Sequence, residues 1–349
     1  MTLDLWTHLK STNKPIALYG TGDGADKIIA KLKLDGTFDK VAGIFASSNF
    51  VRERYFQGFK VESFEDCHER LGDMIVLMCF GSFREEVIEN AHKIASVCEF
   101  YAPDVPVYGS NIFDLDFYNS NKDKIEEVIT HLSDDLSVKT MRNTVTNKLT
   151  GDILPLEECE TTEDEINSLF TLKNDSTYVD LGAYNGDTIL KYTDKFKEIS
   201  TIYAVEPDSR SFRKLKANTE ELSSKIEINY INALISNKSG EAFLDDNKGR
   251  GVHESSKGIA INSTTVDEIL NGKPADFIKF DVEGNELIAI EGAANTIRAY
   301  KPVMNIACYH RSEDIFTIPL KVLEINPDYK IYMRHLPHIP GWDTEFIFV

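Results

Sequence analysis

Two stretches of this chain repeat one pattern, in which short apolar runs alternate with amphipathic helical segments. The first stretch reads KPIALYGTGDGADKIIAKLK, KVAGIFAS, DMIVLMCFGSFREEVIENAHKIA, CEFYAP and VPVYG. Strand-like runs separated by helices are typical of βαβ units, whose strands are parallel. The pattern therefore predicts a small Rossmann-like α/β domain over residues 1–112.

The second stretch predicts a larger sheet of the same class over residues 171–349. Seven strand-like runs follow one another there: TYVDLGAYNGDTILKY, TIYAVEPDSRSFRKLKANT, IEINYINALIS, ADFIKFDVEGNELIAIEGAANTI, KPVMNIACYHR, YKIYMRH and TEFIFV. The turn-rich LPHIPGWD between the last two favours a hairpin over a helical crossover. We therefore expect a seven-stranded, doubly wound, Rossmann-like sheet.

Residues 113–170 lie between these stretches and are charged, with few strand signals. We expect a helical connector here, with helices around residues 124–132 and 162–172. A chain of 349 residues also exceeds the roughly 100 to 200 residues of a common single domain, which favours two cores.

Composition excludes several classes of partner. The 57 acidic and 38 basic residues give a formal net charge of −19, which repels nucleic-acid phosphates and anionic membrane surfaces. No uninterrupted apolar window approaches the roughly 18 residues of a membrane helix, and the first residues carry no signal-peptide pattern. The five cysteines are widely spaced, without a C-x-x-C pair, as is typical of reduced core residues. We expect a cytoplasmic protein with no nucleic-acid partner and no membrane span; a homo-oligomer is compatible with this composition.

A glycine turn after the first strand of the second stretch is the strongest sign of a binding site. The sequence VDLGAYNGDT places Asp180, Gly182, Gly186 and Asp187 where a strand ends and a helix begins. Glycines let a ligand approach the backbone closely, and a helix N-terminus offers free N–H groups. A carboxylate at Asp187 would repel a pyrophosphate but suits the cationic sulfonium and amino group of S-adenosylmethionine. The alternative is a glycine turn that binds no ligand.

An acidic residue ends the next strand in AVEPD. Glu206 lies twenty residues after Gly186, and a carboxylate at this position can accept both hydroxyls of a ribose. With the D-x-G-x-x-x-G spacing in place of G-x-G-x-x-G, it indicates a nucleoside cofactor other than a dinucleotide.

These motifs carry a family resemblance. Four blocks, YVDLGAYNGDT, AVEPD, IKFDVEGNELIAIEGA and YHRSEDIFTIPLKVLEINPDYKIYMRH, resemble the FkbM family of methyltransferases over roughly residues 165–349. The resemblance implies S-adenosylmethionine as the methyl donor and O-methylation as the usual reaction. It implies glycans, polyketides or other secondary products as acceptors. Family members also occur with an N-terminal Rossmann-like domain.

The resemblance extends to single positions. Asp180, Gly182, Gly186 and Asp187 match the family's cofactor loop, and Glu206 matches its ribose-binding acid. Two residues that close the third strand fall where such folds meet the adenine. The predicted cofactor-binding residues are Asp180, Gly182, Ala183, Tyr184, Asn185, Gly186, Asp187, Glu206, Pro207, Asn232 and Ala233.

Carboxylates also follow the fourth strand, in FDVEGNE. Asp281 and Glu283 should lie at the carboxyl edge of the sheet, where open α/β folds bind ligands. Alternation sends both to the same side if the strand continues through them. They can serve as a general base for an acceptor hydroxyl or as oxygen ligands for a divalent cation. The alternative is that they cap the following helix.

Histidines supply the remaining candidates for the acceptor side. His310 ends the predicted fifth strand, beside the fourth, so its imidazole could face Asp281 as a general base. His335, at the end of the sixth strand, is a weaker candidate. His253 lies in a loop that either shapes the acceptor pocket or is simply polar surface. The predicted catalytic residues are Asp281, His310 and Glu283, and the metal candidates are Asp281 and Glu283.

The N-terminal stretch has its own glycine turn, GTGDG, at residues 20–24. The next strand runs into Ser47 and Ser48 with no acid for an NAD ribose, so a redox cofactor is not expected. A docking or structural domain and an acceptor-related nucleotide site, such as one for a nucleotide sugar, both stay open.

Together these observations predict an S-adenosylmethionine-dependent O-methyltransferase. Its acceptor would be a hydroxyl of a small molecule or glycan, with a sugar or nucleotide-sugar derivative favoured. Two alternatives stay open: a catalytically silent nucleotide- or glycan-binding assembly protein, and an NAD(P)-dependent enzyme that uses the N-terminal glycine loop.

Overall fold

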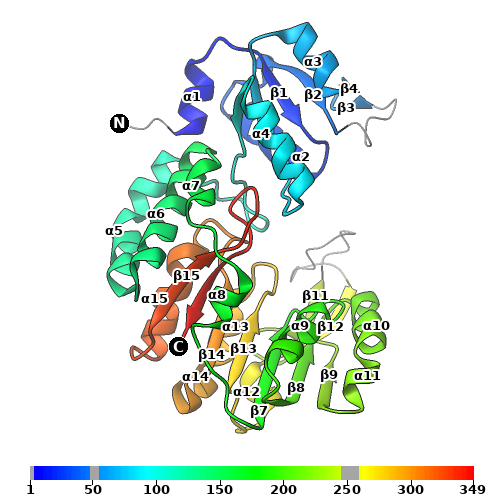
Figure 1. Cartoon of the computed structure of the whole chain (residues 1–349), viewed down its shortest axis with the longest axis vertical. Coiled ribbons are helices and arrows are strands. Elements are labelled where there is room, and N and C mark those ends of the chain that lie inside the picture. The colour runs from blue at the N-terminus through cyan, green and yellow to red at the C-terminus, as the bar shows by residue number, and fades with distance from the viewer. Residues whose placement is uncertain (1–3, 48–54, 245–258) are drawn as a thin grey trace.

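A computed structural model describes residues 4–47, 55–244 and 259–349 of the chain. Two α/β units are joined by a layer of helices, with the N-terminal unit at the top of Figure 1 and the larger C-terminal sheet below it. The C-terminal sheet has seven strands and the N-terminal sheet has six. The predicted fold class is confirmed.

The N-terminal sheet has the strand order β3-β4-β2-β1-β5-β6. Its strands are β1 (Ile16–Tyr19), β2 (Val41–Phe45), β3 (Tyr55–Phe56), β4 (Phe59–Glu62), β5 (Ile75–Met78) and β6 (Glu99–Tyr101). Its helices are α1 (Leu5–Ser11), α2 (Asp23–Leu34), η1 (Phe38–Lys40), α3 (Phe64–Leu71) and α4 (Glu85–Ala95). Strands β1 and β5 are buried along their whole length, which explains their continuous apolar runs.

One strand-like run of the N-terminal stretch is not a strand. The segment VPVYG forms a loop, because its backbone groups bond outside the sheet. The Lys27 ammonium donates to the carbonyls of Pro106 and Val107, at 2.9 Å each. The backbone N–H of Tyr108 donates to the carbonyl of His310, at 2.9 Å. This loop therefore connects the N-terminal unit to the C-terminal one.

The C-terminal sheet has the order β15-β16-β14-β13-β7-β8-β9. Its strands are β7 (Ser176–Leu181), β8 (Ile199–Val205), β9 (Glu227–Ile231), β13 (Phe277–Phe280), β14 (Val303–Ala307), β15 (Ile331–His335) and β16 (Thr344–Phe348). All pairs are parallel except those of β16, which runs antiparallel to β14 and β15. The strand order reverses at β7, and open α/β sheets bind ligands at such a point.

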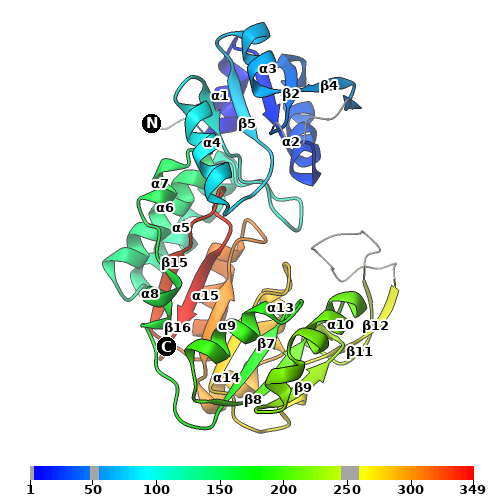
Figure 2. The same cartoon turned by 45° about the vertical axis from the view of Figure 1, so that its right-hand side comes forward.

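Helices flank this sheet (Figure 2). They are α9 (Asp187–Lys195), α10 (Ser209–Asn218), α11 (Glu220–Ser223), α12 (Val266–Leu270), α13 (Glu286–Glu291), α14 (Ala294–Tyr300) and α15 (Asp314–Ile325). No helix in the described ranges is both long and apolar enough to cross a bilayer.

The predicted third strand divides in two. Strand β9 ends at Ile231, and the rest of the run becomes β10 (Leu234–Ile235) in a separate three-stranded sheet with β12 (Ile259–Thr264) and β11 (Gly240–Leu244). Between them, the Asn232 side chain donates to the carbonyls of Glu206 and Pro207, at 2.8 and 3.0 Å. These bonds tie the chain to the end of β8, where it leaves the large sheet.

Four helices span the segment between the two units: α5 (Leu115–His131), α6 (Asp135–Thr150), α7 (Leu154–Glu157) and α8 (Glu163–Asn167). The helix predicted over residues 124–132 corresponds to only the second half of α5, and α6 was not predicted. Helix α6 buries polar side chains, including Thr140, Thr144 and Asn147, so its inward face shows no apolar periodicity.

Side chains of this segment and of one hairpin cross between the two units. Phe113, Ile125 and Met141 belong to the hydrophobic core of the C-terminal sheet. Ile153 and Ile339 belong to a core of the N-terminal unit. The loop between β15 and β16 reaches that unit, where Ile339 and Ser82 exchange two backbone hydrogen bonds of 2.8 and 3.0 Å (Figure 2).

Candidate active site

The glycine turn after β7 is pressed against the end of β13. Gly182 has φ +83°, and a Cβ there would lie 1.9 Å from the carbonyl oxygen of Asp281. Its N–H and that of Ala183 donate to the carbonyl of Val205, at 3.0 and 2.9 Å. Gly186, with φ +86°, is the N-cap of α9. The turn therefore holds the ends of β7, β8 and β13 together.

The other residues of this turn have local hydrogen bonds. The Asn185 side chain accepts from the N–H of Asp187 at 3.1 Å, and the exposed Asp187 carboxylate accepts from the N–H of Thr188 at 2.9 Å. Tyr184 has a left-handed backbone, with φ 45°, and its side chain is exposed. The side chains of Tyr184 and Asp187 are therefore accessible to a ligand above the turn.

Asp180 lies at the end of β7 and is completely buried. Neither of its carboxylate oxygens has a hydrogen bond of good geometry among the described residues. Burial raises the pKa of this carboxyl to about 6, although Lys279 and the nearby Tyr178 hydroxyl oppose the rise. A buried polar group without such a bond is unusual and needs an explanation, such as a bound ligand or water.

Glu206 follows β8 and is 6% exposed. Its carboxylate accepts from the N–H groups of Tyr184, at 2.9 Å, and Asp208, at 2.7 Å. Burial raises its pKa to about 7. The structure thus brings Glu206 to the same turn as Gly182. The Asn232 side chain donates to the carbonyl of Glu206, and Ala233, the next residue after Asn232, is buried.

On the acceptor side, β13 ends at Phe280, so the strand does not continue through Asp281 and Glu283. Glu283 instead has a left-handed backbone, with φ 55°. Both carboxylates nevertheless face one imidazole. The Nε2 atom of His310 lies 3.6 Å from Asp281 Oδ1 and 3.6 Å from Glu283 Oε2. Lys279 Nζ lies 2.9 Å from the other oxygen of Asp281.

His310 lies in the loop after β14 and not at the strand end, and it is 1% exposed. Its Nδ1 atom lies 2.9 Å from Glu286 Oε1. Burial lowers the pKa of His310, but Glu286, Asp281 and Glu283 outweigh it and raise that pKa to about 10. A cationic imidazole is a poor general base near neutral pH, which argues against the base role predicted for His310.

Asp281 has the opposite shift. Burial raises the pKa of its carboxyl, but Lys279 and His310 outweigh burial and hold that pKa below its usual value. Asp281 therefore stays ionised at neutral pH and can accept a hydrogen bond. Glu286, which the sequence did not single out, is equally part of this cluster.

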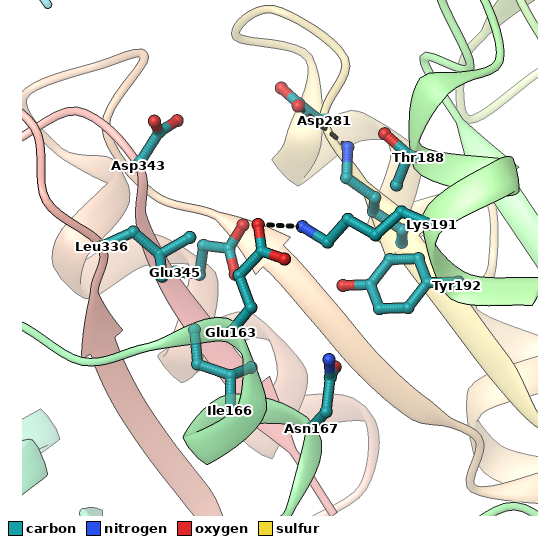
Figure 3. A pocket seen from close by; sticks show the side chains of 11 residues that line it. Glu163, Ile166, Asn167, Thr188, Lys191, Tyr192, Asp281, Leu336, Asp343 and Glu345 are labelled. Carbon is teal, nitrogen blue, oxygen red and sulfur yellow. Dashed lines mark hydrogen bonds and ion pairs between the residues drawn. The ribbon is translucent and has the colours of Figure 1, made fainter. Parts of the chain in front are cut away.

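A cavity of about 180 Å³ opens beside Asp281 (Figure 3). It lies between α8, α9, the end of β13 and the chain that enters β16. Its lining residues are Glu163, Ile166, Asn167, Thr188, Lys191, Tyr192, Lys279, Asp281, Leu336, Asp343 and Glu345. Four carboxylates and two ammonium groups make this lining strongly polar, and Glu163 pairs with Lys191 (Figure 3).

Two of these carboxyls, unlike that of Asp281, have a raised pKa. Burial raises the pKa of Glu345 to about 7 despite a 2.7 Å hydrogen bond from Asn305. Burial also raises the pKa of Asp343. The sequence did not predict these residues, because they come from elements far from the motifs.

The connecting loop of the N-terminal unit supports the acceptor side. The guanidinium of Arg311 lies 4.2 Å from the centre of the Tyr108 ring. Arg311 Nε also donates to the carbonyl of Gly284, at 2.6 Å. A Cβ on Gly284 would lie 2.8 Å from that of Tyr108. With the bond from the Tyr108 N–H to His310, these contacts hold the loops after β13 and β14 together.

The remaining histidine candidates are placed elsewhere or lie outside the described residues. His335 is buried, its Nδ1 lies 2.9 Å from Thr344 Oγ1, and burial lowers its pKa to about 3. It is therefore neutral and held within the sheet. His253 lies outside the described residues.

The N-terminal glycine turn also packs tightly, but against a different partner. A Cβ on Gly24 would lie 2.2 Å from the carbonyl oxygen of Cys79. At the neighbouring strand end, the Ser47 hydroxyl lies 2.7 Å from that of Tyr19. The described residues that follow β2, Ala46 and Ser47, include no carboxylate.

The strand order of the C-terminal sheet and its inserted antiparallel strand are those of a Rossmann-like methyltransferase fold. Residues 180–334 match a family profile described as Methyltransferase FkbM domain. The chain carries an FkbM methyltransferase domain, which confirms the resemblance found in the sequence. None of the curated proteins matches the chain.

Solved structures share this architecture. The chain is similar to the methyltransferase FkbM from Methylobacillus flagellatus KT, with a TM-score of 0.73 and 19% identity, over 99% of this chain and 92% of that one. This likeness extends over both units and shows the fold. A smaller likeness is to Aeropyrum pernix fibrillarin with bound S-adenosyl-L-methionine, with a TM-score of 0.33 and 16% identity, over 52% of this chain and 69% of that one. Another is to SMU.1697c from Streptococcus mutans in complex with SAH, with a TM-score of 0.36 and 11% identity, over 54% of this chain and 97% of that one.

Proposed function

We propose that the chain is an S-adenosylmethionine-dependent O-methyltransferase whose acceptor is a polar, hydroxyl-bearing small molecule or glycan, with a sugar favoured. One observation carries this proposal: two buried carboxylates, Asp180 and Glu206, lie at adjoining strand ends beside the Gly182 turn, and that turn touches the loop of Asp281. The elements for a cofactor and those for an acceptor therefore adjoin at one edge of the sheet.

Residues at the cofactor side fit a nucleoside that carries a cationic amino acid. Each oxygen of the Glu206 carboxylate accepts one backbone N–H, which leaves lone pairs for the ribose hydroxyls. The carboxylate of Asp180, which has no hydrogen bond of good geometry among the described residues, offers acceptors for an ammonium group, directly or through water. S-adenosylmethionine, when bound, supplies an electrophilic methyl group on its sulfonium.

Residues at the acceptor side fit a polar molecule. Asp281 is ionised and partly exposed, so it can orient an acceptor hydroxyl and take up its proton. Alignment of the reacting atoms alone contributes roughly 7 to 11 kcal/mol to such a reaction. The excess of carboxylates in the cavity repels a diphosphate, so the cavity would receive the sugar part of an acceptor and not its nucleotide.

Binding of S-adenosylhomocysteine to the full chain tests the cofactor side. We expect calorimetry to give saturable binding, and Glu206→Ala to weaken it by roughly 1.5 to 3 kcal/mol, because the ribose loses a charged acceptor. Glu227→Ala is the control, because Glu227 begins β9 and so lies at the edge of the sheet opposite to Glu206. Unchanged affinity in folded Glu206→Ala would refute the ribose assignment.

Mass spectrometry tests the reaction. The protein is incubated with S-adenosylmethionine and candidate monosaccharides, amino sugars, glycans or nucleotide sugars, and the products are examined for the mass of one added methyl group. Methylation on a sugar hydroxyl supports the proposal. Methylation only on nitrogen or carbon, across active acceptors, contradicts it.

A further inference from the structure

We propose that Asp281, Glu286 and His310 form a binding site for a divalent cation. One ligand atom from each residue lies within 4.8 Å of the others. The three come from the end of β13, the first turn of α13 and the loop after β14. Its catalytic use rests on the proposed function, but cation binding does not.

Glu286 provides an independent reason for a ligand here. This residue is 1% exposed, and its Oε1 atom accepts from the N–H groups of Val282, at 2.9 Å, and Gly284, at 3.3 Å. Its Oε2 atom is buried and has no hydrogen-bond partner among the described residues. Oε1 also lies 2.9 Å from His310 Nδ1, so the carboxylate is held in place through Oε1 and has Oε2 to spare, as a metal ligand requires.

Burial favours the same conclusion. The carboxylates of Asp281 and Glu286 lie beside the two nitrogens of the buried His310 ring, at 3.6 and 2.9 Å. Buried carboxylates are stable when they are paired or coordinate a metal. A divalent cation would supply such a partner to both.

The donor set indicates the kind of cation. Carboxylate oxygens suit Mg²⁺, Ca²⁺ and Mn²⁺, and imidazole suits later transition metals, so a mixed set favours Mn²⁺ or Zn²⁺. Glu283 Oε2, 3.6 Å from His310 Nε2, can supply a further oxygen. A ligand imidazole is neutral, so the cation would replace the ring proton. The sequence had suggested Asp281 with Glu283; the geometry makes Glu286 and His310 the buried ligands.

Asp281 also lines the cavity, so the cation would lie next to an acceptor bound there. Within the proposed function, a hydroxyl that coordinates a divalent cation loses its proton more readily, because the positive charge stabilises the alkoxide. The acceptor oxygen would then be bound by the cation and oriented by the residues that hold it.

Electron paramagnetic resonance of free Mn²⁺ tests the site on the full chain, without cofactor or acceptor. We expect the protein to remove Mn²⁺ from solution at one site, and Glu286→Gln and Asp281→Asn each to weaken binding at least about tenfold. Glu291→Gln, an exposed glutamate at the other end of α13, should bind like the parent.

Zn²⁺ calorimetry on the same four proteins completes the test. The proposal is overturned if the parent binds neither ion, or if both cluster variants bind like Glu291→Gln. Asp281 is partly exposed, so Asp281→Asn provides a folded variant even if Glu286→Gln is unstable. Intact S-adenosylhomocysteine binding in a protein that binds no metal would overturn the cation site alone.

Discussion

The two units share one backbone device. In each, the connection from the first strand to the following helix has a glycine with no room for a Cβ. Gly24, in the first turn of α2, lies against the carbonyl of Cys79, and Gly182, in the turn after β7, lies against that of Asp281. In both cases the carbonyl belongs to the end of the neighbouring parallel strand. Close packing of two strand ends therefore accounts for a glycine whether or not a ligand binds there.

The side chains beside the two turns differ. The C-terminal turn has Asp180 and Glu206, two buried carboxylates at adjoining strand ends. The N-terminal turn has the hydroxyls of Tyr19 and Ser47, bonded to each other. The comparison teaches that a glycine turn alone indicates packing, and that the acids beside it indicate a ligand.

The largest expected effect tests whether the C-terminal edge is the site of reaction. Replacing Asp281 with Asn removes the carboxylate that faces the acceptor, and turnover should fall by about 10²- to 10⁴-fold. The affinity for S-adenosylhomocysteine should hardly change. Asp276→Asn, at the opposite end of the same strand, is the control in both assays. Parent-like turnover in Asp281→Asn would remove the catalytic assignment.

The glycines themselves test the shared device. Gly182→Ala and Gly24→Ala should each lower the free energy of unfolding by about 3 kcal/mol, because the added methyl meets a backbone carbonyl. Gly182→Ala should be the worse of the two, since its φ of +83° is also strained for alanine. Urea unfolding measures both. If Gly24→Ala is neutral, the two turns are not equivalent in packing.

The pH dependence of cofactor binding distinguishes the two turns further. The pKa of Glu206 is raised to about 7, so the carboxylate gains a proton as the pH falls from 8 to 6. A neutral acid is a weaker acceptor, and S-adenosylhomocysteine affinity should fall by about tenfold over this range. Glu206→Gln should show a flat profile in the same calorimetric series. A parallel fall in both proteins would assign the titration to another group.

The smallest expected effect is none at all. NADH titrated into the full chain should give no saturable fluorescence change, because Ala46 and Ser47, the described residues that follow β2, offer no carboxylate for a ribose. If NADH binds with micromolar affinity and Gly182→Ala binds it equally well, the dinucleotide site lies on the N-terminal unit. The difference drawn between the two glycine turns would then be wrong.

Much of the fold could be predicted because most of its strands are short, largely apolar runs. The seven strands of the large sheet and its final hairpin followed from this signal. Asp180, Glu206 and Asp281 could be singled out as well, because the carboxyl ends of parallel strands meet at one edge of a sheet. Their roles in binding and catalysis stay predictions.

Other features could not be predicted because they depend on tertiary contacts. Glu345 carries no local motif, and only the packed sheet brings it to the cavity beside Asp281. Glu286 ends the FDVEGNE run, but nothing in that run shows that its carboxylate lies against His310. Helix α6 buries polar side chains such as Thr144, so it looks like a solvated segment in the sequence. The charge of His310 depends on carboxylates from two other segments, and no pattern around the residue itself reveals it.

The exchange of core side chains between the units has a thermodynamic consequence. Ile153 and Ile339 complete an N-terminal core, and Phe113 and Met141 complete the C-terminal one. Unfolding of either unit would expose apolar surface on the other, so their free energies of unfolding are coupled and do not add. The chain should lose both sheets in one cooperative calorimetric transition, although it contains two sheets that each resemble an independent fold.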